Sequence, residues 1–77
     1  MNLEKKDVCV YVKDEIQLQN VKELLEKYKE NIDVHLFDLQ YNFVQYSVLD
    51  NDWFTTEQYE LKKVKLSKLE EILKQEL

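Results

Sequence analysis

The chain has 77 residues, a formal net charge of −5, one cysteine, one histidine, and neither glycine nor proline. This length accommodates one domain and excludes a catalytic domain joined to a regulatory one. Because glycine and arginine are both missing, the sequence excludes a P-loop, a dinucleotide-binding fingerprint and bidentate arginine contacts to phosphate. The net acidity, with lysines dispersed along the chain, also disfavours direct binding to nucleic acid.

The cysteine content and the hydropathy of the chain indicate where the protein works. A single cysteine allows no disulfide framework, and no segment approaches the about 20 apolar residues that cross a bilayer. Residues 1–6 are polar at the start, and no apolar signal core follows them. We therefore expect a cytoplasmic protein with no membrane partner. We expect a single domain over residues 1–77, with residues 1–6 disordered or loosely ordered.

The first expected element is a strand over Asp7–Lys13, in which three valines alternate with Cys9 and Tyr11. The valines share one face of this strand, and a helix is expected to cover that face. Cys9 lies in the middle of the strand, where a small packing residue is favoured over an activated thiolate.

A helix is expected over Glu15–Glu30. Asp14 has the character of its N-cap, and Gln17 stands at the spacing of a capping box. The apolar residues recur at helical spacing: Leu18, Val21, Leu24, Leu25 and Tyr28. With no glycine available, Asn31 is the expected left-handed residue that ends this helix.

Two strands, Ile32–Leu39 and Phe43–Leu49, are expected to form the next hairpin. A three-residue loop would join them, with Asn42 in the left-handed conformation. The register that matches their apolar faces pairs Val34 with Val48, Leu36 with Tyr46 and Asp38 with Val44.

Asp50, Asn51 and Asp52 form a turn by composition. The following stretch, Trp53–Leu66, is too long for one strand, so we expect an interruption. A helical turn near Thr56–Glu60 and then a strand over Leu61–Leu66 fit the pattern best.

Ser67 and Glu70 form a second capping-box pattern, which predicts a final helix over Lys68–Leu77. Its apolar stripe consists of Leu69, Ile72, Leu73 and Leu77. The order β-α-β-β-β-α predicts an α+β fold: an antiparallel or mixed sheet of three to four strands, one long helix on one face and a short C-terminal helix. The opposite sheet face is either covered by the C-terminal helix, which we favour, or meets another protein.

The charges of the chain are unevenly distributed. Residues 30–61 contain seven acids and, apart from His35, no basic side chain, and they hold seven of the nine aromatic residues. Aromatic side chains are favoured anchors in interfaces, and carboxylates beside them attract a basic partner. The alternative is that the rings are core residues and the acids lie in solvated turns. The residues expected to bind a protein partner are Asp50, Asp52, Trp53, Phe54, Glu57, Tyr59 and Glu60.

No cofactor or metal site is expected. One histidine and one cysteine cannot build a zinc site, and the acids Asp50, Asp52 and Glu57 lack the spacing of a calcium loop.

A further alternative is a hydrolase, because the expected register brings His35 opposite Ser47 with Asp33 on the same face. These are the ingredients of acyl-transfer catalysis. No amide nest that could serve as an oxyanion hole is evident nearby, so we expect a polar cross-strand pair and no enzyme.

The sequence therefore predicts a small acidic protein-binding module. Its expected partner is a larger basic protein, such as one that binds nucleic acid, which it would inhibit or modulate by presenting carboxylates in place of phosphates. In composition, this arginine-free chain rich in Lys, Glu and Asn resembles accessory proteins of AT-rich phages and mobile elements, such as anti-CRISPR and immunity proteins. The alternative is a homo-oligomeric structural protein, for example a homodimer, without a heterologous target.

Overall fold

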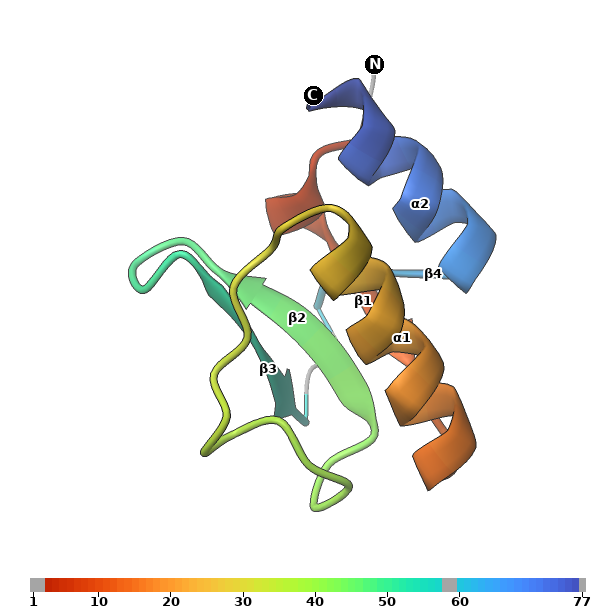
Figure 1. Ribbon diagram of the computed structural model, residues 1–77, viewed down its shortest axis with the longest axis vertical. Helices are drawn as coiled ribbons and strands as arrows, with labels where there is room; N and C mark the ends of the chain where they lie inside the picture. Colours follow the sequence, from red (N-terminus) through yellow and green to blue (C-terminus); the bar gives the residue numbers. More distant parts are fainter. Residues whose placement is uncertain (1–2, 58–59, 77) are drawn as a thin grey trace.

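A mixed four-stranded sheet with two helices against it forms the fold of this protein, in a computed structural model that describes residues 3–57 and 60–76 (Figure 1). The elements, in chain order, are the 3-10 helix η1 (Lys5–Asp7), β1 (Val8–Tyr11), α1 (Glu15–Lys27), β2 (Phe43–Ser47), β3 (Asp52–Thr56), β4 (Lys62–Val64) and α2 (Leu66–Gln75). This arrangement confirms the expected α+β class and the β-α-β-β-β-α order, with η1 added in a region where no element was expected.

The sheet has the strand order β3-β2-β1-β4. Strand β2 pairs antiparallel with both β1 and β3, whereas β4 pairs parallel with β1. Val10 stands opposite Val44 on one side and Val64 on the other, so three valines form one row across the sheet. Because side chains alternate between faces along a strand, Val8, Val10, Val44 and Val64 share a face with Trp53.

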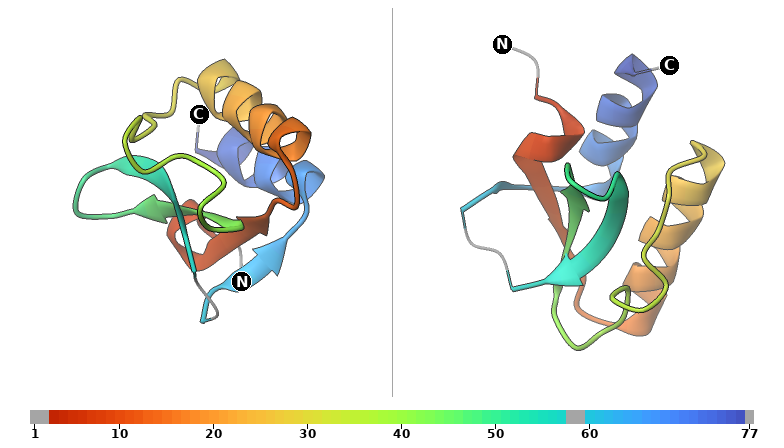
Figure 2. Two further views of the ribbon diagram at one scale, coloured as in Figure 1. Left: turned by 90° about the horizontal axis from the view of Figure 1, so that it is seen from below. Right: turned by 90° about the vertical axis from the view of Figure 1, so that its left-hand side faces the viewer.

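Both helices cover this valine face, as Figure 2 shows from two directions. The buried residues of α1 (Val21, Leu24, Leu25) and of α2 (Leu69, Ile72, Leu73) belong to one hydrophobic cluster with the valines. Glu70 joins the helices, because its carboxylate accepts hydrogen bonds from Lys27 Nζ at 2.9 Å and from the Tyr28 hydroxyl at 3.0 Å. The expectation that the C-terminal helix covers the opposite sheet face is therefore wrong.

Helix α1 begins where the sequence predicted. The Asp14 carboxylate accepts a hydrogen bond from the Gln17 backbone N–H at 2.9 Å, which satisfies one free donor of the first turn. The Gln17 side chain in turn accepts from the backbone N–H of Lys13 at 2.9 Å. The reciprocal bond of the capping box is thus made one residue before the N-cap.

The end of α1 differs from the prediction. Lys29, not Asn31, adopts the left-handed conformation, with φ 59°. Its N–H donates to the Glu26 carbonyl, and the N–H of Glu30 donates to the Leu25 carbonyl. These two bonds form a Schellman motif, which closes the helix two residues earlier than expected.

The segment expected to be a strand over Ile32–Leu39 is irregular and does not pair with β2. It runs instead beside β3: Ile32 forms an isolated parallel bridge with Trp53, and the Leu36 carbonyl accepts from Thr55 N–H. The Asp33 carboxylate accepts from the backbone N–H groups of His35 and Leu36, which competes with a regular ladder. The predicted pairings of Val34, Leu36 and Asp38 with β2 are therefore wrong.

The turn between β2 and β3 lies at the predicted position. Asn51, with φ 55°, is its left-handed residue. In the preceding loop, Asn42 was expected to be left-handed, but it is not among the described residues with positive φ, so that prediction is wrong. Asp52 already belongs to β3, where it stands opposite Ser47.

The expected interruption of Trp53–Leu66 is present, because β3 ends at Thr56 and β4 starts at Lys62. The central residues of the predicted helical turn, 58 and 59, lie outside the described residues. Helix α2 starts at Leu66 with Lys65 as its N-cap and without a side-chain cap, so the predicted capping role of Ser67 is wrong. Leu77, the last residue of its predicted stripe, is outside the described residues.

Candidate protein-binding surface

Strand β3 places residues that the sequence assigned to one binding surface on opposite faces of the sheet. Trp53 faces the helices and has 0% exposed surface, whereas Asp52 and Phe54 point to the other side of the sheet. We call this other side the helix-free face. By strand alternation and register it contains Cys9, Tyr11, Phe43, Gln45, Ser47, Asp52, Phe54 and Lys63.

Trp53 is a core residue in this structure, which corrects its assignment as an interface anchor. Its indole Nε1 donates to the Glu30 carboxylate at 3.1 Å, and its ring packs against Tyr46 with the centroids 5.5 Å apart. Because no part of Trp53 reaches the surface, we remove it from the candidate site.

The same Glu30 carboxylate anchors the N-terminal segment. Lys5 Nζ donates to Glu30 at 3.0 Å and lies 4.3 Å from the centre of the Tyr46 ring. Burial lowers the pKa of the Lys5 ammonium. The hydrogen bond and charge of Glu30, together with the charge of Glu76 at 3.5 Å, outweigh this effect, so the pKa of Lys5 lies above its ordinary value of 10.5. One of the seven acids of residues 30–61 is thus paired with a lysine of the same molecule.

A second group of acids lies at the turn between β2 and β3, at the left of Figure 1. We call it the acidic tip and define it as Asp33, Val48, Leu49, Asp50 and Asp52. Leu49 is 95% exposed and Val48 60% exposed. Within the described part of the chain, none of these three aspartates forms an ion pair with a lysine. The tip therefore combines bare aliphatic surface with unpaired negative charge.

The charges of the acidic tip lie close enough to influence one another. The pKa of Asp52 is raised from its ordinary value of 3.8, first by partial burial and then by the charges of Asp33 and Asp50. Asp50 is fixed by Ser47, whose hydroxyl accepts from the Asp50 backbone N–H at 3.2 Å and donates to its carboxylate at 3.4 Å. The tip is therefore an ordered turn. An approaching cation would relieve the repulsion among its carboxylates.

Phe54 lies on the helix-free face, where aromatic rings remain partly accessible. Tyr11 is 46% exposed, and its ring meets that of Phe43 edge-on, with the centroids 5.6 Å apart. Cys9 is buried in this face as expected of a packing residue, and burial raises the pKa of its thiol although Lys63 opposes the shift. The aromatic character that the sequence indicated thus persists on the helix-free face.

The remaining predicted residues lie away from the tip. Glu57 and Glu60 are exposed and follow the opposite end of β3. Tyr59 lies outside the described residues. The six predicted residues that the structure describes are therefore divided between the acidic tip, the core, the helix-free face and the far end of β3.

Two residues that sequence reasoning missed are Val48 and Leu49. They were assigned to the end of a strand, where alternation would have buried one of them. The available signal was their position directly before the Asp-Asn-Asp turn, because side chains at the end of a hairpin have no neighbouring strand to cover them.

The hydrolase hypothesis loses its geometric basis. Ser47 stands opposite Asp52, not His35, and its hydroxyl is hydrogen-bonded to Asp50. Asp33 contacts His35 through the backbone N–H of the latter. The expected alignment of Asp33, His35 and Ser47 depended on a register that the sheet does not have.

Within residues 3–57 and 60–76, no group of three or more His, Cys, Asp or Glu side chains is arranged to hold a metal ion. In the same residues, no helix has the length and apolarity required to cross a membrane. Comparison of the chain with protein-family models, with curated proteins and with solved structures gave no significant match. Functional inference for this chain therefore depends on the geometry of its own surface.

Proposed function

We propose that this protein is a binding module whose acidic tip docks onto a basic surface of a larger protein. The observation that carries the proposal is Leu49, which is 95% exposed beside aspartates that no lysine of the described residues neutralises. An exposed aliphatic side chain gives a partner an apolar contact, and the surrounding carboxylates guide a positively charged partner toward it.

The electrostatics of the tip support a basic rather than a neutral partner. The pKa of Asp52 is raised first by partial burial and then by the charges of Asp33 and Asp50, so a lysine or arginine of a partner near these groups relieves a charge repulsion already present in the free protein. Complementary charge mainly increases the association rate, and salt screens this effect.

The finer form of the proposal is that the partner binds nucleic acid, and that the tip inhibits it. Carboxylates held on an ordered turn would then occupy positions that phosphates otherwise take. A chain without arginine or glycine is unsuited to hold the nucleic acid itself, which agrees with action on the protein.

The test compares two variants that change charge and hydrophobicity equally. The tip variant carries Leu49→Ser, Asp50→Asn and Asp52→Asn. The control carries Ile16→Ser, Glu23→Gln and Glu26→Gln on the exposed side of α1, where Ile16 is 74% exposed. Proteins captured from a host lysate by the wild type are identified by mass spectrometry, and Kd values are measured with the purified partner at several salt concentrations.

We expect the tip variant to weaken binding at least about tenfold and to flatten its salt dependence, while the control binds as the wild type does. Binding should also weaken in acid, beginning at a higher pH than an ordinary aspartate would give, because the pKa of Asp52 is raised. Equal Kd values for the tip variant and the wild type would contradict the proposal. So would a capture experiment in which the wild type binds no lysate protein that the tip variant does not also bind.

A further inference from the structure

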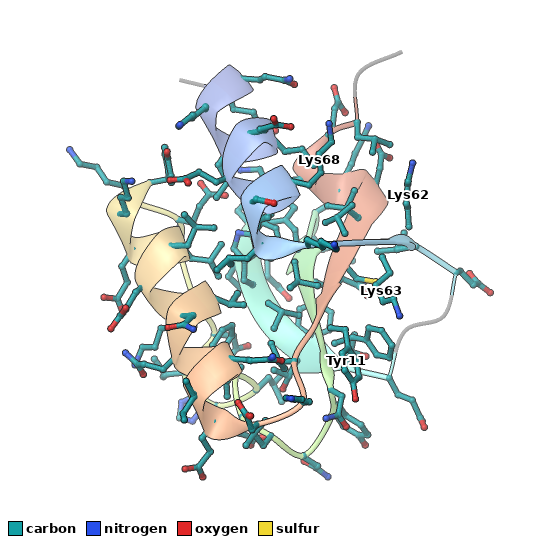
Figure 3. All side chains as sticks on the ribbon, turned by 90° about the vertical axis from the view of Figure 1, so that its right-hand side faces the viewer. Tyr11, Lys62, Lys63 and Lys68 are labelled. Atoms are coloured by element: carbon teal, nitrogen blue, oxygen red, sulfur yellow. The ribbon has the colours of Figure 1, made fainter. Side chains whose placement is uncertain are left out.

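A groove of about 540 Å³ lies between the sheet and the beginnings of the two helices. Its walls come from the end of β1, from β4 and the residues after it, and from the first half of α1. Figure 3 looks toward this side, where Tyr11 lies below Lys63 and α1 runs along the left. Its volume is in the range of small-molecule sites, about 300–1,000 Å³.

The topology of the sheet explains why a groove forms there. Strands β1 and β4 are parallel neighbours, and each is followed by a helix, so the chain leaves both strands at the same end. Ligands in sheets with parallel strands commonly bind outside these carboxyl ends. Helix α2 begins at this end without a side-chain cap, so its first backbone N–H groups add positive partial charge.

The groove is positively charged in a protein that is acidic overall. Three lysines line it, Lys13, Lys63 and Lys65, and no carboxylate is among its lining residues. Lys13 and Lys65 form no ion pair with any described residue. The Lys63 ammonium lies 5.5 Å from the centre of the Tyr11 ring and belongs to the helix-free face, away from the valines. Lys13 and Lys65 are therefore the two lysines available to a ligand in the groove.

The acids nearest to the groove along the chain lie outside its lining. The Asp14 carboxylate is directed to the Gln17 N–H at the start of α1. Glu15 lines a different groove, between α1 and the segment around Phe37. The positive rim is thus a local property that the net charge of −5 conceals.

The floor of the groove is aliphatic, formed by Val10, Val12, Val21, Val64 and Leu66. An inorganic anion or a nucleotide phosphate chain would leave this surface without a partner, and the chain has neither arginine nor glycine to hold phosphates closely. A lysine ammonium is a compact charge that pairs well with a single carboxylate. The lining therefore fits a ligand with one anionic head and a short aliphatic body.

We propose that this groove is a binding site for a small amphiphilic carboxylate, with the aliphatic chain on the valine floor and the carboxylate between the lysines. The site shares no residue with the acidic tip, so it stands or falls independently of the proposed protein partner.

The test is a titration of ¹⁵N-labelled protein with octanoate, followed by amide chemical shifts. Octanol and octyltrimethylammonium serve as the neutral and the cationic ligand of equal chain length, and acetate serves as the head group alone. We expect octanoate to shift the amides of residues 10–13, 17–21 and 63–66, and to bind more tightly than the other three compounds.

Two charge variants decide the role of the lysines. Lys13→Glu with Lys65→Glu should weaken octanoate binding at least about fivefold, whereas Lys6→Glu with Lys29→Glu, which changes the net charge equally outside the groove, should not. Asn20→Trp, on the α1 wall, should obstruct the groove without altering charge and should therefore weaken octanoate binding. This variant tests the site even if the lysine variant does not fold. Shifts dispersed over the whole protein, equal affinity for octyltrimethylammonium, or unchanged binding by Asn20→Trp and the lysine variant would overturn the proposal.

Discussion

Glu30 connects the N-terminal segment with β3. The Glu30 side chain is 16% exposed. Its carboxylate accepts hydrogen bonds from the indole of Trp53 in β3 and from the ammonium of Lys5 near the N-terminus. A buried donor that loses its acceptor costs about 1–3 kcal/mol, more than a typical hydrogen bond contributes in net terms. Glu30 is therefore a structural residue, in contrast to the acids of the tip.

Replacing Glu30 tests this role. Glu30→Ala leaves the Trp53 indole unpaired and should lower the free energy of unfolding by about 2–3 kcal/mol, measured by urea denaturation at pH 7. Glu30→Gln retains an acceptor and should cost less, and Glu23→Ala on the exposed side of α1 should change stability by less than about 0.5 kcal/mol.

The stabilisation by the Lys5–Glu30 pair should decrease at high pH. Because the folded-state pKa of Lys5 lies above 10.5, its pairing contributes at neutral pH and is lost as the pH rises through that raised value. The difference between the wild type and Glu30→Gln should therefore narrow in strong alkali. Equal stability of Glu30→Ala and Glu23→Ala would show that the carboxylate is not needed by the fold.

At the scale of elements, the absence of glycine affects how helices and turns end. Among the described residues, the two with positive φ are Lys29 and Asn51, and neither is glycine. Asparagine tolerates this region better than most residues, but lysine carries the steric cost of its Cβ. The Schellman bonds after α1 are strong enough in context to hold Lys29 there.

Lys29→Gly should accordingly stabilise the protein by about 0.5–1 kcal/mol, because glycine removes the Cβ clash at φ 59°. Glu23→Gly, inside the same helix, should do the opposite and cost about 1 kcal/mol. Thermal unfolding followed by circular dichroism measures both changes. A lower Tm for Lys29→Gly would mean that this position carries no strain.

At the scale of the whole molecule, two helices on one sheet face produce a single core, and neither helix covers the other face (Figure 2). At about 0.05–0.15 kcal/mol per residue, a chain of this length has roughly 4–12 kcal/mol of stability. The burial of Leu69 at 0% exposure therefore represents a large share of it, whereas Leu49 at 95% exposure contributes to folding hardly at all.

Leu69→Ala should reduce the free energy of unfolding by about 2–5 kcal/mol, because it removes buried methylene groups and leaves a cavity. Leu49→Ala removes the same atoms from the surface and should change stability by less than about 0.5 kcal/mol. Chemical denaturation of the two variants gives the comparison. A similar loss from both would contradict the separation between a core leucine and one available for binding.

The sequence alone was sufficient at several places where the relevant interactions are local. The cap at Asp14, the apolar stripes of both helices, the strand around Val10 and the turn at Asn51 all depend on residues within a few positions of each other. These features gave the element order and the α+β class. The prediction failed at the end of α1, because no short-range rule identifies lysine as the left-handed residue.

Tertiary structure decided the rest, because strand pairing and helix placement are set by contacts between distant segments. Nothing local shows that β2 pairs with β1, that residues 32–36 run beside β3, or that α2 shares a face with α1. The division of Trp53 and Phe54 between opposite faces was implicit in strand alternation, but which of them is buried depended on where the helices lie. Composition established an acidic, aromatic central segment, and only folding determined which of its side chains remain at the surface.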